Sequence, residues 1–522
     1  MLKKTKKEGK KRLFIALLFL LVCDFGETLA QTRSTHNASV AKNLELFNEI
    51  YRMLDLFYVD TLSADTVMQW AIEGMLRRVD PFTEYYPEES DDLRQMATGK
   101  YAGIGAIIRY MKSVDRTVIA EPYADTPSSR AGLKAGDVII SVDGKDTKGM
   151  DTQKVSQMLR GEAGTTLKLV YKSEGDMLRE TEITRETIQL PAIPFYGMLG
   201  DGIGYLYLSS FTEGCAKEMR AALLDLKSKG ATRMLLDLRG NPGGSLNEAV
   251  DVVNIFVDKG EKVVYTRGKI SPANQEYLTT TKPVDTQMPV VVMVNGGTAS
   301  SAEIVSGCLQ DLDRAVVMGA RTYGKGLVQM VRELNSGGAV KVTTSRYYIP
   351  SGRCIQAHDY KHDGTESIVP DSLQKTFYTR DGREVKDGGG IKPDVIVKKD
   401  SVGRGFWQVE ASDAFFDWCT RYVRQHQQVT TVEQLSITDE DFEDFVHYVT
   451  EADTTLCADT LEKYRVRLML DLTQDLATRY YGNAGAVYYG ALNDPNLRKA
   501  CELLLDDERM RQILRLETKN DK

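Results

Sequence analysis

The segment from Pro289 to Leu312, PVVVMVNGGTASSAEIVSGCLQDL, contains the change of pattern that decides the fold. It begins with the apolar run PVVVMV, which is typical of a buried strand, and ends with AEIVSGCLQDL, in which apolar residues recur at helical spacing. The residues between them are Asn, Gly, Thr, Ala and Ser. The segment therefore predicts a strand-to-helix corner without bulky side chains, with the adjacent serines Ser300 and Ser301 at the start of the helix.

The chain on both sides of this corner repeats the same alternation of strand and helix. Apolar strand patterns and helical patterns follow one another in GIGYLYLSSF, a helix over 214–229, TRMLLDLRG, a helix over 245–257, PVVVMVN, a helix over 301–312, RAVVMG and GGAVKVTTSRYYIP. Alternating strands and helices indicate an α/β core. We expect this core to span residues 191–404.

Three other parts of the chain have different patterns. Residues 31–99 form a predicted N-terminal helical segment, whose helical spacing ends at the breaker Asp80–Pro81. Residues 100–190 consist of short strands and glycine turns, which indicates a small β-rich domain. Residues 405–522 are polar and helical to the end, which predicts a C-terminal helical domain.

The first 30 residues have the three parts of a signal peptide. MLKKTKKEGKKR is basic, LFIALLFLLV is apolar, and small residues precede a cleavage site after Ala30. A lipid anchor on Cys23 and an uncleaved membrane anchor are the alternatives. The net charge is −7; without these 30 residues, which hold seven Lys/Arg and three Asp/Glu, it is −11. We expect an exported, periplasmic or envelope-associated protein, and the acidic balance argues against a nucleic-acid partner.

The sequence offers little support for a metal, a nucleotide or a trypsin-like site. No CxxC pair supports zinc or thioredoxin chemistry, and export permits disulfides whose pairing the sequence does not give. GARTYGKG resembles the start of a P-loop, but Gly326 follows Lys325 where a P-loop has Ser or Thr. In DLRGNPGGS the position of a trypsin-like nucleophile is Pro242. We therefore expect no metal and no cofactor.

The glycines Gly243 and Gly244 follow the strand RMLL and precede a helix. Backbone amides exposed at such a turn suit an oxyanion hole or an anion site, and a structural turn that needs positive φ is the alternative.

A hydroxyl nucleophile at the serine corner needs a base. None of the five histidines lies near a serine in a recognisable motif, namely His36, His358, His362, His426 and His447. A buried lysine is another candidate base, because burial lowers its pKa and favours the neutral amine. Lys325 lies between two glycines, which allow another backbone to approach it closely.

The β-rich domain contains AGIGA, in which glycines flank Ile104 immediately before a strand. The amides of Gly103, Ile104 and Gly105 can point together at one carboxylate. With AGLKAGDVIISVDG downstream, the domain resembles a PDZ domain, whose bound peptide adds a strand beside that loop. A purely structural β domain is the alternative.

NGGTASSAEI together with TYGKGLVQ resembles the C-terminal processing peptidases, also called tail-specific proteases, which are serine proteases with a Ser-Lys dyad and a PDZ domain. The resemblance maps the nucleophile to Ser300, the general base to Lys325 and an orienting amide to Gln329. It covers roughly residues 42–400. The family commonly has Ser-Ala-Ser-Glu at the corner, whereas this chain has Ser-Ser-Ala-Glu, so Ser301 is an alternative nucleophile.

The resemblance implies a crotonase-like α/β protease core, interrupted by the PDZ domain and followed by the helical domain. We expect cleavage of exported proteins near their C-termini through an acyl-enzyme on Ser300. The amides of Ser301 and of Gly243 or Gly244 would bind the oxyanion. Arg160 matches a basic residue that the family has near the contact of PDZ domain and core, although a solvated arginine at a helix end is the alternative.

Substrates with accessible C-termini are the expected partners. A catalytically inactive, peptide-binding adaptor is the competing function. The sequence leaves open whether residues 405–522 dimerise the protein, recruit a partner or cap the core.

Overall fold

The computed structural model describes residues 35–87, 91–173, 177–361, 365–397, 402–427 and 431–515. The predicted signal peptide and Cys23 lie outside these ranges. Among the helices in the described ranges, none has the length and apolar character that crossing a bilayer requires.

The chain divides into two compact units, residues 1–77 and 78–522. In the described part of the first unit, residues 35–57 are helical and are followed by α2 (Ala64–Leu76). The Ser63 side chain caps α2 by accepting a hydrogen bond from the Thr66 amide. These helices confirm the helical pattern that precedes Asp80–Pro81.

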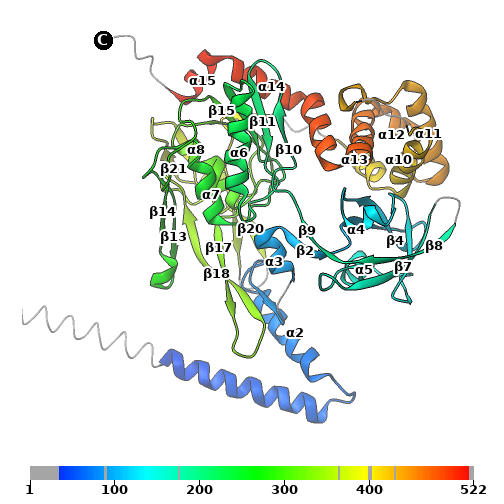
Figure 1. Cartoon of the computed structure of the whole chain (residues 1–522). Helices are drawn as coiled ribbons and strands as arrows, with labels where there is room; N and C mark the ends of the chain where they lie inside the picture. Colours follow the sequence, from blue (N-terminus) through cyan, green and yellow to red (C-terminus); the bar gives the residue numbers. More distant parts are fainter. Residues whose placement is uncertain are drawn as a thin grey trace, which may run out of the picture. The chain divides into compact units, whose positions relative to one another are not determined.

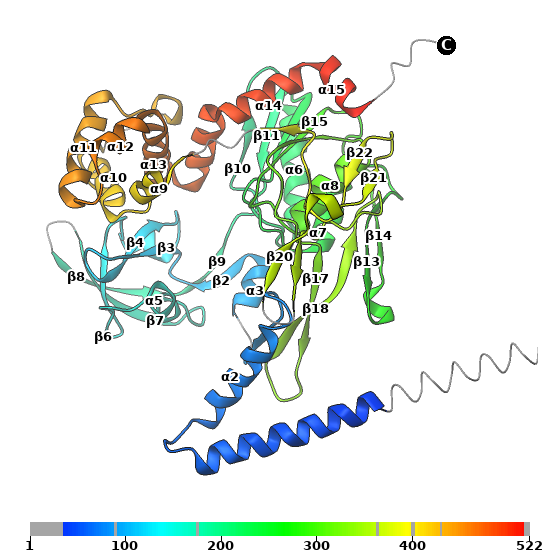
Figure 2. The same ribbon diagram turned by 180° about the vertical axis from the view of Figure 1, so that it is seen from behind.

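The second unit contains a β-rich domain inserted between two antiparallel strands, β2 (Lys100–Gly103) and β9 (Glu186–Gln189) (Figures 1 and 2). Because Lys100 pairs with Gln189, the chain enters and leaves the domain at one place. Its sheet has the order β3-β4-β5-β7-β8, with β6 paired to β5. The elements are β3 (Ala106–Met111), β4 (Arg116–Pro122), α4 (Pro127–Arg130), β5 (Val138–Val142), β6 (Lys145–Asp146), α5 (Thr152–Leu159), β7 (Thr166–Lys172) and β8 (Leu178–Thr184).

The α/β core is built on a six-stranded sheet of order β10-β11-β12-β15-β16-β23, parallel except for the β10–β11 pair. Every residue of β15 is buried, as expected of a strand covered on both faces. The elements are β10 (Phe195–Met198), β11 (Ile203–Tyr207), α6 (Cys215–Ser228), β12 (Arg233–Asp237), α7 (Leu246–Val253), β15 (Val290–Val294), α8 (Ser301–Asp311), β16 (Val316–Gly319) and β23 (Val395–Ile396).

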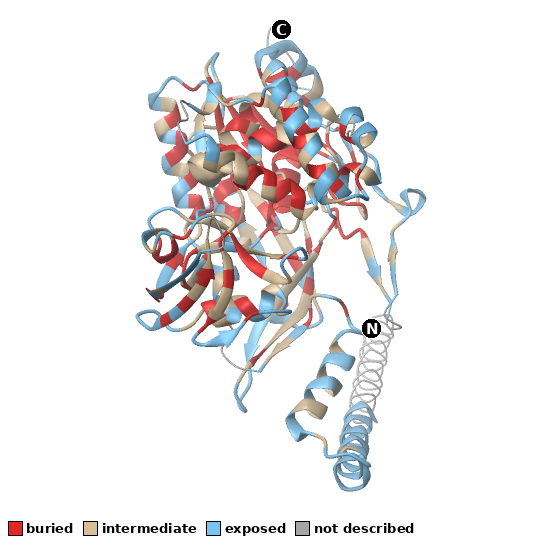
Figure 3. Cartoon of the chain, turned by 90° about the vertical axis from the view of Figure 1, so that its right-hand side faces the viewer, coloured by how far each residue is buried: buried red, intermediate tan, exposed pale blue. Residues whose placement is uncertain are grey.

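Two layers of helices cover this sheet. Helices α6, α7 and α8 share one hydrophobic cluster with one face, and α14 (Pro495–Leu505), α15 (Asp507–Leu514) and Ala491 share another with the opposite face. Figure 3 shows how buried residues concentrate in these layers. The last helices of the chain therefore complete the core.

A second sheet of the core has the order β1-β18-β13-β14, with β17 also paired to β18. Strand β1 (Glu84–Tyr86) precedes the inserted domain, yet Glu84 pairs with Lys341 of β18 (Ala339–Tyr348). The other strands are β13 (Lys262–Gly268), β14 (Glu276–Leu278) and β17 (Leu327–Glu333), and two hairpins add β19 (His358–Tyr360) with β20 (Glu366–Ile368) and β21 (Thr376–Tyr378) with β22 (Glu384–Lys386).

The C-terminal helices first form a separate hydrophobic cluster around Trp418, Phe442 and Phe445. Phe416 extends from this group onto Met111 and Val118 of the inserted domain. Helix α13 is kinked at Gly482, where the backbone is not helical (φ 68°, ψ −172°). The helices are α9 (Arg404–Glu410), α10 (Asp413–Gln425), α11 (Asp439–Ala452), α12 (Ala458–Lys463) and α13 (Arg465–Asn493).

The residues of α13 beyond the kink contact the core, where Tyr488 stacks on Phe195 with ring centroids 4.9 Å apart. The helices that follow residue 402 therefore contact both the inserted domain and the core.

Candidate active site

Ser300 lies between β15 and α8 with a backbone conformation that is rare for a residue with a side chain (φ 53°, ψ −117°). Small neighbours make this turn possible, because a Cβ built at Gly297 would lie 3.1 Å from the Gly240 Cα. Thr298 Oγ1 fastens the loop by donating to the Leu238 carbonyl at 2.8 Å. The predicted strand-to-helix corner is confirmed, with Ser300 half-buried at its tip.

The side chain of Ser301 points elsewhere. Ser301 is 1 % exposed, and its Oγ donates to the Gly244 carbonyl oxygen at 2.8 Å. A buried hydroxyl bound to the backbone is poorly placed to attack a substrate, so the geometry favours Ser300 over the alternative Ser301.

Glu303, in the first turn of α8, joins the serine corner to the loop that carries Lys325. Its carboxylate is fully buried and accepts four hydrogen bonds. Oε2 accepts from the amides of Ser300 and Lys325, both at 2.9 Å. Oε1 accepts from the Gly324 amide at 2.8 Å and from Thr322 Oγ1 at 2.5 Å. One oxygen thus fixes the backbones of both predicted catalytic residues.

Burial raises the pKa of Glu303 to about 7, although its four hydrogen-bond donors act in the opposite direction. An ionised carboxylate only accepts hydrogen bonds, so it matches four donors, whereas a protonated carboxyl must break at least one of these contacts.

Lys325 is half-buried beneath the ring of Phe82, with Nζ 4.2 Å from the ring centroid. Burial lowers the pKa of Lys325, and the charge of Lys341 lowers it further, while Asp80, Glu84 and Glu303 raise it. Phe82 is held by the turn in which Asp80 Oδ1 accepts from the amides of Phe82 and Thr83, both at 2.8 Å. The environment thus makes the neutral amine of Lys325 more accessible than that of an exposed lysine.

The Gln329 amide does not lie where the sequence placed it. Its Nε2 donates to Thr343 Oγ1 at 3.1 Å, and within the described ranges no hydrogen bond joins it to Lys325. A register shift between Val328 and Gln329 alters the alternation of β17, and Lys325 itself precedes the strand. The alternation of side chains along β17 therefore does not place Gln329 on the same face as Lys325.

Gly243 contacts the serine corner directly. A Cβ built on it would lie 2.8 Å from Ser300 Cβ and 2.9 Å from the Ala299 oxygen, and its φ is +99°, so the position requires glycine. Its amide, however, donates to Asn241 Oδ1 at 2.8 Å.

Within the described part of the chain, the amides of Gly244 and Ser301 have no hydrogen-bond acceptor. These two amides are therefore available to donate a hydrogen bond, whereas the Gly243 amide already has an acceptor.

The described residues contain no group of three or more His, Cys, Asp or Glu side chains placed to hold a metal ion. The six cysteines from Cys215 to Cys501 are free thiols. Both ring nitrogens of His358 have partners, the Glu366 carboxylate and the Tyr323 carbonyl oxygen.

Comparison with known proteins identifies the family. Residues 202–371 match the model of peptidase family S41, residues 118–173 a PDZ domain, and residues 408–461 the C-terminal helical domain of probable PDZ-proteases. A carboxy-terminal-processing protease of Bartonella bacilliformis is 36% identical over 335 residues, which is 63% of this chain and 76% of that protein. This chain belongs to the carboxy-terminal-processing proteases of peptidase family S41.

A probable CtpA-like serine protease of Staphylococcus epidermidis is 31% identical over 364 residues, 67% of this chain and 72% of that protein. Among solved structures, the photosystem II D1 C-terminal processing protease is similar, with 28% identity, 69% and 94% of the two chains covered and a TM-score of 0.37. The expected fold class, an S41 protease core with an inserted PDZ domain and a C-terminal helical domain, is confirmed.

The PDZ domain of this S41 protease has a groove between β3 and α5, lined at one end by Gly103, Ile104, Gly105 and Arg160. The amides of Ile104 and Gly105 have no acceptor within the described ranges. The Arg160 guanidinium lies 5.1 Å from the centroid of the Tyr101 ring. The residues predicted to capture a carboxylate therefore do meet at one end of one groove.

Three residues of the site were not assigned a role from the sequence, namely Glu303, Phe82 and Asn241. A signal existed for Glu303, because an acidic residue three positions after a serine at a helix start is the pattern of a capping box. Phe82 contacts Lys325, and Asn241 accepts a hydrogen bond from the Gly243 amide; no local sequence pattern predicts either contact.

We expect Glu303→Gln to remove a pH dependence of stability. Because the folded protein raises the pKa of Glu303 from its ordinary 4.5 to about 7, the group's contribution to stability is complete below pH 4.5 and is lost as the pH rises to about 7. That loss amounts to about 3 kcal/mol in the wild type. The free energy of unfolding, measured with urea at pH 5 and at pH 8, should therefore differ less for Glu303→Gln than for the wild type.

Cleavage by Glu303→Gln should fall roughly 10-fold or more, because an amide cannot accept all four hydrogen bonds. Glu248→Gln is the matched control, since the Glu248 carboxylate also accepts two backbone amides, those of Gly214 and Ala216, on the helix side of the core. Equal losses of activity in the two variants would contradict the proposed role of Glu303. So would a free energy of unfolding that depends on pH equally in Glu303→Gln and in the wild type.

Proposed function

We propose that this S41 protease is a serine endopeptidase that cleaves exported proteins near their C-termini, with Ser300 as nucleophile and Lys325 as general base. The observation that carries the proposal is the single Glu303 oxygen that accepts hydrogen bonds from the amides of both residues. A shared acceptor fixes the separation of the two backbones, and precise placement of reacting groups is a large part of catalysis.

In the proposed reaction the neutral Lys325 amine accepts the Ser300 hydroxyl proton as Oγ attacks the scissile carbonyl carbon. The carbonyl oxygen becomes an oxyanion that the amides of Gly244 and Ser301 stabilise. Collapse of this intermediate breaks the peptide C–N bond, and the Lys325 ammonium returns its proton to the leaving amine. Lys325 then deprotonates a water that attacks the acyl-enzyme carbonyl, and as the C–Oγ bond breaks the Lys325 ammonium returns this proton to Ser300 Oγ.

The opposing influences on Lys325 suit this cycle. Burial disfavours the ammonium, whereas the face of the Phe82 ring attracts it. A base that must accept and return a proton in each turnover needs both of its forms to be accessible.

The PDZ groove supplies the proposed preference for C-termini. A peptide lying along β3 would add a strand to the sheet and place its terminal carboxylate at the amides of Ile104 and Gly105. Helix α3 (Asp91–Thr98) offers a contact from this groove to the core, since Gln95 lines the groove and the Ala97 carbonyl accepts from the Glu213 amide at 3.0 Å. We propose that Arg160, beside this helix, couples peptide binding to activation.

Ser300→Ala should lower cleavage of an unfolded protein such as β-casein by roughly 10⁴-fold or more and leave the thermal midpoint nearly unchanged. Ser301→Ala loses only the hydrogen bond to the Gly244 carbonyl, so it should keep more than about a tenth of the activity. A serine-directed fluorophosphonate should label the wild type at Ser300. An active Ser300→Ala variant would show that the nucleophile assignment is wrong, and an unreactive, non-cleaving wild type would favour the adaptor.

The rate of cleavage should rise with pH through a single ionisation below that of an ordinary lysine, because burial lowers the pKa of Lys325. Arginine keeps the charge and does not lose its proton, so Lys325→Arg should be roughly 10²- to 10⁴-fold slower, as should Lys325→Met. The depressed pKa also means that stability from this group is lost as the pH falls, and Lys325→Met should lessen that loss. An active Lys325→Arg variant would exclude Lys325 as the base.

Amidation of a substrate's last carboxylate should raise KM roughly 10-fold or more, since it removes charge-assisted hydrogen bonds to the PDZ groove. Arg160→Ala should instead lower kcat while isothermal calorimetry still detects the free peptide in the groove. Equal KM for the acid and amide substrates would argue against C-terminal recognition, and an unchanged kcat in Arg160→Ala would refute the coupling.

A further inference from the structure

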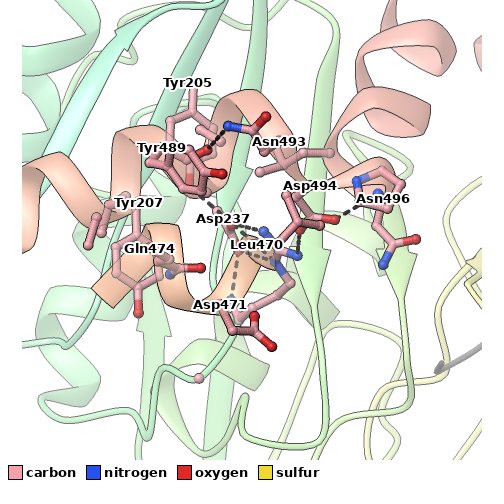
Figure 4. Close-up of a pocket in the computed structure, with 18 of the residues that line it drawn as sticks. Tyr205, Tyr207, Asp237, Leu470, Asp471, Gln474, Tyr489, Asn493, Asp494 and Asn496 are labelled. Carbon is pink, nitrogen blue, oxygen red and sulfur yellow. Dashed lines mark hydrogen bonds and ion pairs between the residues drawn. The ribbon is translucent and has the colours of Figure 1, made fainter. Parts of the chain in front are cut away.

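Arg239 connects the loop after β12 to the C-terminal helices through ion pairs with two carboxylates, those of Asp237 and Asp494, which are labelled in Figure 4. On the core side it binds Asp237, the last residue of β12, which is 2 % exposed. Arg239 Nε donates to Asp237 Oδ1 at 2.9 Å, and Nη2 donates to Asp237 Oδ2 at 2.6 Å. Tyr205 OH also donates to Asp237 Oδ2, at 3.1 Å.

The remaining guanidinium nitrogen, Nη1, forms an ion pair with Asp494 Oδ2. Asp494 stands between α13 and α14, and its other oxygen caps α14 by accepting from the Asn496 amide at 2.7 Å. Each oxygen of this carboxylate therefore has a separate partner, one in the C-terminal helices and one in the protease core.

The ion pair borders a cavity of about 500 Å³ that lies between the core and α13, and residues from both halves of this helix line it. Tyr205, Gly240 and Asn295 line its core side, and Tyr489, Asn493 and Asp494 are among the residues that line the helical side. Burial disfavours the charged form of Arg239, but Asp237 and Asp494 raise its pKa above that of an ordinary arginine. The guanidinium therefore stays charged between two carboxylates.

The neighbours of Arg239 in the chain hold the serine corner. The Leu238 carbonyl accepts from Thr298 Oγ1, and the Gly240 amide donates to Asn295 Oδ1 at 3.0 Å. The Asn241 carbonyl accepts from the Ala299 amide at 2.9 Å. A displacement of Arg239 would therefore be transmitted on both sides to the residues that precede Ser300.

We propose that Asp494 is a positioning residue of the active site, which holds Arg239 and thereby the loop 238–244 against the serine corner. The C-terminal helices would on this view complete the catalytic site as well as cover the sheet. The proposal rests on the proposed function for its effect on rate, because that loop carries the Gly244 amide assigned to the oxyanion.

A second ion pair across the same boundary provides a matched control. Arg233 Nη2 lies 3.2 Å from Asp507 Oδ1, and Arg233 is the first residue of β12, whereas Asp237 is the last. Arg233 lies at the start of β12 and Arg239 just beyond its end, and only the Arg239 pair lies in the loop that contacts the serine corner. If these ion pairs only dock the C-terminal helices on the core, breaking either pair should have the same effect. If Asp494 positions the loop 238–244, only breaking the Arg239 pair should affect the serine corner.

The variants to compare are Asp494→Asn, Asp494→Ser and Asp507→Asn in the full mature chain. Asparagine and serine both cap helices well, so α14 keeps its cap, while the ion pair to Arg239 is lost. We expect both Asp494 variants to lower kcat on β-casein roughly 10- to 100-fold with KM unchanged, because small displacements of a catalytic group have effects of this size. Asp507→Asn should match the wild type.

Hydrogen–deuterium exchange gives a readout that does not need cleavage. Amides of residues 239–244 and 295–300 should exchange faster in the Asp494 variants than in Asp507→Asn. Unchanged kcat and exchange in the Asp494 variants, or equal changes in all three, would overturn the proposal. A wild type that fails to cleave would contradict the proposed function instead, and the exchange data would still decide whether Asp494 orders the loop.

Discussion

The buried carboxylate of Glu303 is the constraint on which the catalytic region depends. A group with acceptors only is enclosed by four donors that come from the start of α8 and from residues 322–325. Burying such a group is unfavourable unless every hydrogen bond forms, so β15, β16 and α8 must all be in register before the site exists. The positive φ of Ser300 is tolerated because this network over-determines the turn.

The protease core is assembled from three separated parts of the chain. Strand β1 precedes the PDZ domain, the sheet and its first helix layer follow it, and α14 and α15 come from the end of the sequence. The C-terminal helices are also packed on the PDZ domain, through Phe416 and the ion pair of Arg109 with Asp413. They thus connect the PDZ domain to the core, a role that composition alone left open.

What the sequence predicted correctly was local. The corner at Ser300, the glycine turn before α7 and the alternation of strands and helices each depend on neighbouring residues whose types restrict the backbone. What it did not predict depends on contacts between distant residues: a register shift turns Gln329 toward Thr343, and the Asn241 side chain takes up the Gly243 amide. Arg239 and Asp494 are 255 positions apart, and no local pattern relates them.

The use of the last two helices as one layer of the core has a consequence for biosynthesis. A chain made from its N-terminus at about 5–20 residues per second needs about 10–40 s to proceed from Ser300 to the end of α15. During that interval the apolar face formed by Leu235, Val291 and Met293 has no cover from α14 or α15. The nascent chain therefore contains Ser300 and Lys325 before it contains the helix layer that completes the core.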